Sequence, residues 1–331
     1  MLKKLAALLC LLALPAHAAD KPVLTIATYE SFASEWGPGP VLKKAFEATC
    51  GCEVVFATSE DGAALLAKLK LDGANAKADL VLGLDDNLVS AAAATGLFAE
   101  HGLDTTGLSL PQPWSDPLFA PFDWGYFAFV YKEGLKNGPP KSLKELVETP
   151  DGPTIIIQDP RTSTPGLGLV TWMKAVYGDK AGEAWTKLRP RVVTVTKGWS
   201  EAYGLFLKGE ADMVLSYSTS PAYHISAEKR TDIKAAMFEE GHALQIEVVG
   251  LLKSAAQPAL ARDFMKLLLA DAGQAVIPET NWMYPARAPA AGLPESFKGL
   301  PVPAKAFAAD TKADAESRRA MIDEWLGAMG R

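Results

Sequence analysis

Apolar runs that suit buried strands alternate with helical patterns along most of this chain. A short apolar run bounded by turn residues is typical of a buried strand, whereas apolar residues spaced three or four apart are typical of a helix. Alternation of the two predicts an α/β fold. The expected strands lie at residues 23–29, 52–58, 78–84, 154–160, 192–196 and 212–218, with further extended runs at 121–131 and 242–252.

The expected strands form two groups, and the aromatic run at 121–131 lies between them. A chain of 331 residues is long enough to bury two substantial cores. The pattern therefore predicts two α/β lobes joined by extended crossings. We expect the first lobe over residues 19–122, the second over 123–278, and a return to the first lobe with a C-terminal helix over 279–331.

The first residues have the pattern of a secretory signal. Lys3 and Lys4 precede an apolar stretch at residues 5–14, and a small-x-small cleavage site follows at 16–18. The apolar stretch is too short to span a bilayer as a helix. We therefore expect residues 1–18 to be a signal peptide that is removed when the chain is exported.

Acidic residues outnumber basic residues by 39 to 33, which gives a formal net charge of −6 at pH 7. Binding to nucleic acid depends largely on Lys and Arg that neutralise phosphates. The charge balance therefore argues against a nucleic-acid partner.

Two cysteines remain in the exported chain, Cys50 and Cys52, with Gly51 between them. In an oxidising compartment such a close pair favours a small disulfide loop over two free thiols. A metal site is disfavoured, because the histidines are scattered and show no ligand spacing relative to the cysteines. The remaining cysteine, Cys10, follows Leu9 rather than a small residue, which disfavours lipid attachment there.

Aromatic side chains gather in the segment 198–224, where a strand, a helix and a second strand are expected in succession. Trp199 lies at the expected start of the helix, and Tyr217 and Tyr223 lie at the end of the second strand. Both kinds of position face the ligand crevice of an open α/β sheet. We expect these three side chains to line a ligand site, and Tyr203, inside the helix, to belong to the core.

Two turns that precede expected helices are candidate anion sites. In the first, Pro165 suits the first helical turn, and Thr164 is the expected N-cap with Ser163 just before it. Free N–H groups and the helix dipole favour an anion such as phosphate at such an end. Capping of the helix alone explains these residues equally well. In the second turn, Asp61 and Gly62 follow a strand, and the carboxylate can instead bind an amine or a cation.

More aromatic residues lie near other strand ends, namely Tyr29, Trp36 and Trp282. Aromatic faces attract cations, and each contact contributes about 0.5–2 kcal/mol depending on desolvation. Aromatic walls, one acid and an anion site together suit a flat, cationic and optionally phosphorylated heterocycle.

Long segments of the chain resemble the periplasmic thiamine-binding proteins of bacterial ABC transporters, and the resemblance covers nearly the whole mature chain. It implies the type II periplasmic-binding-protein fold, with a ligand cleft between two α/β lobes, and a periplasmic location. The segments that carry it are YESFASEWGPGP, ADLVLGLDDNL, PFDWGYFAFVY, QDPRTSTPGLGL, VTVTKGWSEAYGLFLKGE, SYSTSPAYH and IPETNWMYP.

The resemblance also implies the ligands and the partners. The ligands are thiamine, thiamine monophosphate and thiamine diphosphate, and the partners are the permease and the ATPase of an ABC importer. It implies a phosphate near Ser163, Gly62 and Trp199, and a role for Asp61 at the cationic or amino-bearing part. The implied ligand residues are Tyr29, Trp36, Asp61, Gly62, Ser163, Trp199, Tyr217, Tyr223 and Trp282. The anion-site pattern adds Thr164 as a tenth candidate.

Two other functions fit this sequence less well. Thiaminases of similar fold use a cysteine nucleophile, but Cys50 and Cys52 precede a strand instead of following one, and no base is placed with them. Receptors for ferric ion use adjacent tyrosines, whereas Tyr217 and Tyr223 are six residues apart. Receptors for polyamines use several acids, whereas the candidate residues here include one clear acid, Asp61. A binding protein without catalysis and without a cofactor is therefore favoured.

Overall fold

The structure is a computed structural model that describes residues 21–309 and 315–330. The expected signal peptide, residues 1–18, and Cys10 lie outside the described residues. In the part of the chain that is described, no helix is both long and apolar enough to cross a membrane.

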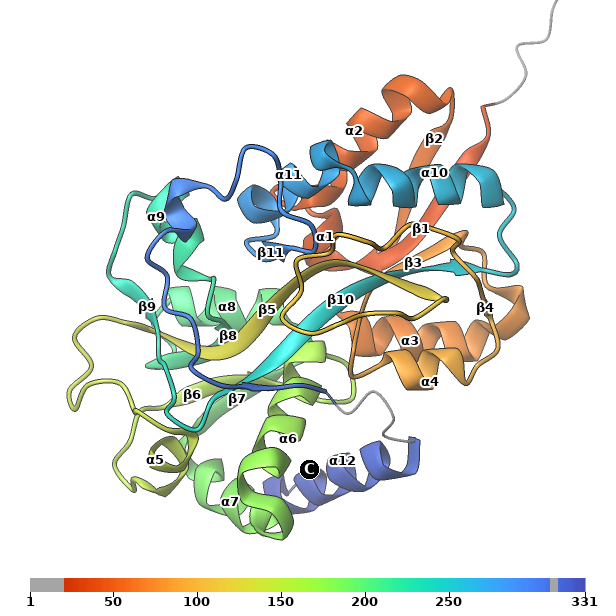
Figure 1. Cartoon of the computed structure of the whole chain (residues 1–331). Helices are drawn as coiled ribbons and strands as arrows, with labels where there is room; N and C mark the ends of the chain where they lie inside the picture. The colour runs from red at the N-terminus through yellow and green to blue at the C-terminus, as the bar shows by residue number, and fades with distance from the viewer. Residues whose placement is uncertain (1–20, 310–314, 331) are drawn as a thin grey trace, which may run out of the picture.

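The first lobe is built on a sheet in which β1 pairs with β2 and β3 in parallel, as the strand–helix alternation predicts. Helices cover both sides of this sheet: α2 and α10 lie on one side and α3 and α4 on the other (Figure 1). The main elements are β1 (Val23–Tyr29), α2 (Pro38–Cys50), β2 (Glu53–Ser59), α3 (Gly62–Asp72), β3 (Leu80–Asp85) and α4 (Val89–Ala93).

The second lobe repeats the same arrangement with its own core. Strand β6 pairs in parallel with β7 on one side and β8 on the other. Its core contains three fully buried tryptophans, Trp172, Trp185 and Trp325. The main elements are α5 (Leu143–Glu148), β6 (Ile155–Gln158), α6 (Thr164–Tyr177), α7 (Ala181–Leu188), β7 (Val192–Thr196), α8 (Trp199–Leu207), β8 (Met213–Tyr217) and α9 (Pro221–Ala227).

Two long strands, β5 (Phe119–Lys132) and β10 (His242–Leu252), join the lobes. Residues 119–126 of β5 pair with β10, and residues 127–131 of the same strand pair with β8 of the second lobe. The predicted crossing at 121–131 is therefore observed as one continuous strand. The sheet order is β2-β1-β3-β10-β5-β8-β6-β7.

The chain re-enters the first lobe along β10, ahead of residue 279. Helices α10 (Pro258–Leu269) and α11 (Asp271–Thr280) bury Phe264 and Ile277 in the same core as β1 and β2. The sequence pattern placed these helices in the second lobe because it offers no sign that the extended run before them changes lobe.

The last helix, α12 (Ala315–Met329), contacts both lobes. Trp325 is fully buried and packs edge-on against Trp185 of the second lobe, with ring centroids 6.4 Å apart. On the first-lobe side, Ile322 packs against the core around α3 and α4, and Arg318 Nη2 donates to the backbone oxygen of Asn87 at 2.7 Å. The apolar residues of this helix thus pack against both lobes.

The predicted disulfide is present between Cys50 and Cys52, whose Cα atoms are 5.2 Å apart. Helix α2 ends at Cys50, and Gly51 takes a left-handed conformation with φ of 63°. Glycine adopts this conformation at no steric cost, which lets the chain fold back within three residues.

Short elements complete the fold. They are α1 (Glu30–Ala33), η1 (Gly73–Asn75), β4 (Phe98–Ala99), η2 (Gly178–Lys180), η3 (Arg189–Arg191), β9 (Ile233–Ala235), β11 (Tyr284–Pro285), η4 (Glu295–Phe297) and β12 (Ala306–Phe307).

Replacing Trp325 by alanine removes a large buried ring from the second-lobe core. We expect Trp325→Ala to lower the free energy of unfolding by about 3–5 kcal/mol, as measured by urea denaturation. The control Arg319→Ala lies on the same helix with its side chain 85% exposed, and should change stability by no more than about 0.5 kcal/mol. Equal small effects from both variants would contradict the packing of α12.

Candidate functional site

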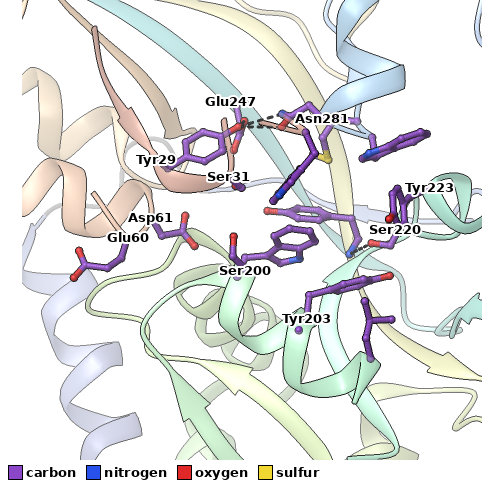
Figure 2. Close-up of a pocket in the computed structure, with 17 residues that line it drawn as sticks. Tyr29, Ser31, Glu60, Asp61, Ser200, Tyr203, Ser220, Tyr223, Glu247 and Asn281 are labelled. Carbon is purple, nitrogen blue, oxygen red and sulfur yellow. Dashed lines mark hydrogen bonds between the residues drawn. The ribbon is translucent and has the colours of Figure 1, made fainter. Parts of the chain in front are cut away.

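A cavity of about 440 Å³ lies between the two lobes (Figure 2). It opens where strands and helices of both lobes end or begin: β1 ends at Tyr29, β8 ends at Tyr217, and α8 begins at Trp199. The loop after α11 adds a third wall. The lining residues are Tyr29, Ser31, Trp36, Glu60, Asp61, Trp199, Ser200, Tyr203, Gly204, Leu207, Tyr217, Ser220, Tyr223, Glu247, Asn281, Trp282 and Met283.

Seven of the ten predicted ligand residues line this cavity. They are Tyr29, Trp36, Asp61, Trp199, Tyr217, Tyr223 and Trp282. The other three, Gly62, Ser163 and Thr164, are not among the lining residues, and all three are buried. Trp36 differs from the rest because it is 52% exposed, which places it at the cavity's mouth.

The second-lobe wall is a stack of aromatic rings. The ring of Trp199 stacks on Tyr203 with centroids 5.0 Å apart and planes at 26°, and its Nε1 donates to Ser216 Oγ at 2.8 Å. Tyr203 is 7% exposed and packs in the core, as expected, but it also lines the cavity beside Trp199. Its hydroxyl lies 2.8 Å from His224 Nε2, which holds the ring in place.

Trp36 and Trp199 approach each other across the cavity from different lobes, with ring centroids 6.3 Å apart. On the third wall, Trp282 meets Tyr223 edge-on at 5.4 Å. The backbone of Trp282 has φ of 57°. A left-handed conformation is costly for a non-glycine residue and is common at ligand sites, where the surrounding structure maintains it.

The starts of α3 and α6 meet across the lobe boundary through Asp61. Its carboxylate caps α3 by accepting from the Gly62 N–H at 2.7 Å. It also accepts from Ser163 Oγ at 2.8 Å and from Thr164 Oγ1 at 2.9 Å. A backbone bond from Ala64 N to Thr162 O at 2.9 Å reinforces this contact. The hydroxyls expected at a ligand phosphate are thus paired with Asp61 in this structure.

One expected helix cap is displaced by one residue. Ser163, not Thr164, is the N-cap of α6, and its Oγ accepts from Gly166 N at 3.5 Å. The extended backbone of an N-cap falls one residue earlier than the sequence pattern indicated. In the turn just before this cap, Arg161 forms a salt bridge with Asp159.

Burial raises the pKa of the Asp61 carboxyl. The hydrogen bonds from Ser163, Gly62 and Thr164 act in the opposite direction, because they stabilise the ionised form. Asp61 therefore joins the lobes through these hydrogen bonds. Breaking them is costly, because it would leave a buried carboxylate without partners.

A second acidic group lies at the buried end of the cavity and was missed by the sequence analysis. Asp123 of β5 and Glu247 of β10 are directly opposite each other in the antiparallel pair. Tyr29 Oη donates to Glu247 Oε2 at 2.7 Å, and Asn281 Nδ2 donates to Asp123 Oδ2 at 2.6 Å. The only signal in the sequence is a single acid inside each of two otherwise apolar runs.

The pKa values of both acids are raised. Burial, then the charge of Asp123, raises the pKa of Glu247 well above its usual range. Burial also raises the pKa of Asp123 to about 7. Among the described residues no cluster of three or more His, Cys, Asp or Glu has the arrangement of a metal site.

Comparison with known proteins identifies the family. Residues 34–275 match the model of the bacterial extracellular solute-binding proteins. The chain belongs to this family. Proteins named "Thiamine-binding periplasmic protein" from Salmonella typhimurium and Escherichia coli are 54% and 53% identical to it over 331 residues, which is the full length of both chains in each comparison.

Solved structures agree with this assignment. A structure titled "Periplasmic thiamin binding protein" superposes with a TM-score of 0.90 at 53% identity, and the match covers 96% of this chain and 99% of that one. The iron-bound HitA of Pseudomonas aeruginosa has a TM-score of 0.75 at 20% identity over 92% of this chain and 99% of that one, a similarity of fold alone. This solute-binding protein therefore has the type II periplasmic-binding-protein fold and is periplasmic.

The stability of this solute-binding protein should depend on pH through its buried acids. The pKa of Asp123 is about 7 in the folded protein, against 3.8 for an ordinary aspartate. Because the folded state binds this proton more tightly than the unfolded state, protonation of Asp123 stabilises the fold. The stabilisation is complete below about pH 4 and is lost as the pH rises through about 7. The free energy of unfolding falls by at most about 1.4 kcal/mol per pH unit.

Urea denaturation between about pH 4 and pH 8 measures this loss. Asp123→Asn, which mimics the protonated acid, should flatten the decline in unfolding free energy. The control Asp151→Asn, at an exposed position, should leave the decline unchanged. An unaltered decline in Asp123→Asn would show that Asp123 ionises normally.

Proposed function

We propose that this protein is a periplasmic receptor that captures thiamine in the cavity between its lobes and delivers it to the permease and ATPase of an ABC importer. The observation that carries the proposal is the cavity itself, which presents aromatic walls and a buried acid in a chain more than half identical to proteins named for thiamine binding. Thiamine carries a flat cationic thiazolium ring and a flat amino-bearing pyrimidine ring joined by a methylene group, which suits both features.

The aromatic walls account for binding of a cationic ring. Trp199 begins α8, Tyr217 ends β8 and Trp282 lies in the loop after α11, and all three line the same cavity. A desolvated cation–π contact contributes up to about 2 kcal/mol, and stacking adds to it. A cavity of about 440 Å³ is also within the usual range for small-molecule sites.

Calorimetric titration with thiamine tests the proposal. We expect one site per chain in the wild type. In Trp199→Ala we expect an affinity at least about tenfold lower, because one aromatic wall is lost. Leu71→Ala, a highly exposed residue outside the cavity, serves as the matched control and should bind like the wild type. No binding heat and no thermal stabilisation of the wild type by thiamine would refute a thiamine receptor.

The phosphate esters of thiamine are proposed as further ligands, with the phosphate directed to the starts of α3 and α6. Support comes from the convergence of two helix N-termini beside the cavity, where N–H groups and hydroxyls suit an anion. Ser163 and Thr164 would then exchange Asp61 for phosphate as the acceptor of their hydroxyl hydrogens.

Ser163→Ala tests where the phosphate lies. We expect the variant to lose about tenfold in affinity for thiamine monophosphate, because a hydrogen bond to a charged group is removed. Its affinity for free thiamine should fall by less than about threefold. Ser31→Ala removes a hydroxyl elsewhere in the cavity wall and should affect both ligands alike. Equal losses in Ser163→Ala would place the phosphate elsewhere.

A role without catalysis is part of the proposal. The thiaminase alternative needs a cysteine nucleophile, and Cys50 and Cys52 are bonded to each other in the described structure, outside the lining of the cavity. Thiamine recovered intact after prolonged incubation with the protein would support a receptor, and base-exchange products would support the enzyme.

A further inference from the structure

Three carboxylates line the cavity, and they differ in what they can offer a ligand. Glu60 is exposed. Asp61 is buried, but it already accepts hydrogen bonds from Gly62 N, Ser163 and Thr164. Glu247 is only 5% exposed and lines the cavity beside Tyr29 and Asn281. Glu247 is therefore the acid best placed to meet a ligand that enters fully.

Neighbouring side chains hold the Glu247 carboxylate in one orientation. Tyr29 Oη donates to Oε2 at 2.7 Å and Gln245 Nε2 donates to Oε1 at 3.0 Å. Asn281 Nδ2 lies 3.1 Å from Tyr29 Oη and continues this set of bonds (Figure 2). A carboxylate has about four acceptor positions, so Glu247 can accept a further hydrogen bond while these remain.

We propose that Glu247 accepts a hydrogen bond from the exocyclic amino group of the ligand's aminopyrimidine ring and thereby selects an amino-bearing ligand. This inference rests on the proposed function. The hydrogen-bonding end of the cavity, formed by Glu247, Tyr29 and Asn281, holds the neutral ring. The aromatic walls formed by Trp199, Tyr217 and Trp282 hold the cationic ring.

The chemistry of a buried carboxylate explains the selection. Both oxygens of Glu247 accept hydrogen bonds, from Tyr29 and from Gln245. An amino group that donates to either oxygen adds to this set, whereas a ring carbonyl in the same place supplies no donor. A site built to hydrogen-bond a substrate N–H rejects an analogue without it, because the buried group is left unpaired. The acids that face Glu247 are Asp123 on β5, Asp85 on β3 and Asp61 before α3, and each raises the cost of an unpaired charge there.

The test compares thiamine with oxythiamine, in which a ring carbonyl replaces the amino group. Calorimetry on the full-length mature protein should give the wild type at least about a tenfold preference for thiamine. In Glu247→Gln that preference should fall to about threefold or less, because the amide can donate to the carbonyl as well as accept from an amine. The preference is a ratio within one preparation, so a partly inactive sample does not change it.

Two further variants control the result. Glu279→Gln removes the same charge from an exposed position on α11 and should keep the wild-type preference. Tyr29→Phe keeps the ring but removes the hydroxyl that orients Glu247, and should give a preference between those of the wild type and Glu247→Gln.

Several outcomes would overturn the inference and leave the proposed function intact. A wild type that binds both ligands equally, or a Glu247→Gln variant with an unchanged preference, would exclude Glu247 as the group that recognises the amine. Failure of the wild type to bind thiamine at all would instead refute the proposed function.

Discussion

The antiparallel pairing of β5 with β10 is the constraint on which the rest of the structure depends. These strands carry the chain between the lobes, so the sheet is continuous across the boundary. They also place Asp123 and Glu247 opposite each other beneath the cavity. Strand pairing fixes the backbone of both acids, and hydrogen bonds from Tyr29 and Gln245 to Glu247 and from Asn281 to Asp123 orient their carboxyl groups. A rigid, buried acid is well suited to discriminate between ligands, because its geometry does not adjust to a poor partner.

A second contact acts across the same boundary, between Asp61 of the first lobe and the hydroxyls of Ser163 and Thr164 of the second. In a two-lobed receptor, closure around a ligand is the step that changes contacts between lobes. The contact between Asp61 and these two hydroxyls therefore lies where closure of the lobes acts. Helix α12 also contacts both lobes, on the core side of α7 and beside α3.

Much of the site was predictable because it follows a rule of α/β sheets. Tyr29, Tyr217 and Trp199 lie where strands end or helices begin, and such positions meet at one edge of a sheet. This rule does not predict Glu247, because Glu247 lies in the middle of β10, a strand that runs through the site and does not end there. The re-entry of the chain into the first lobe escaped prediction for a related reason. An extended run has the same local pattern whichever sheet it joins, and only its pairing partners decide its lobe.

The sequence by itself determined the class of fold, the aromatic character of the site, the disulfide and the family, because each depends on local patterns or on long matching segments. Tertiary structure alone decided that Ser163 and Thr164 donate to Asp61, and that Glu247 is buried in the cavity wall beside Tyr29. These relations join residues about 100 to 220 positions apart. No local pattern reports such contacts, because they arise only when the packing of two lobes brings distant strands and helix starts together.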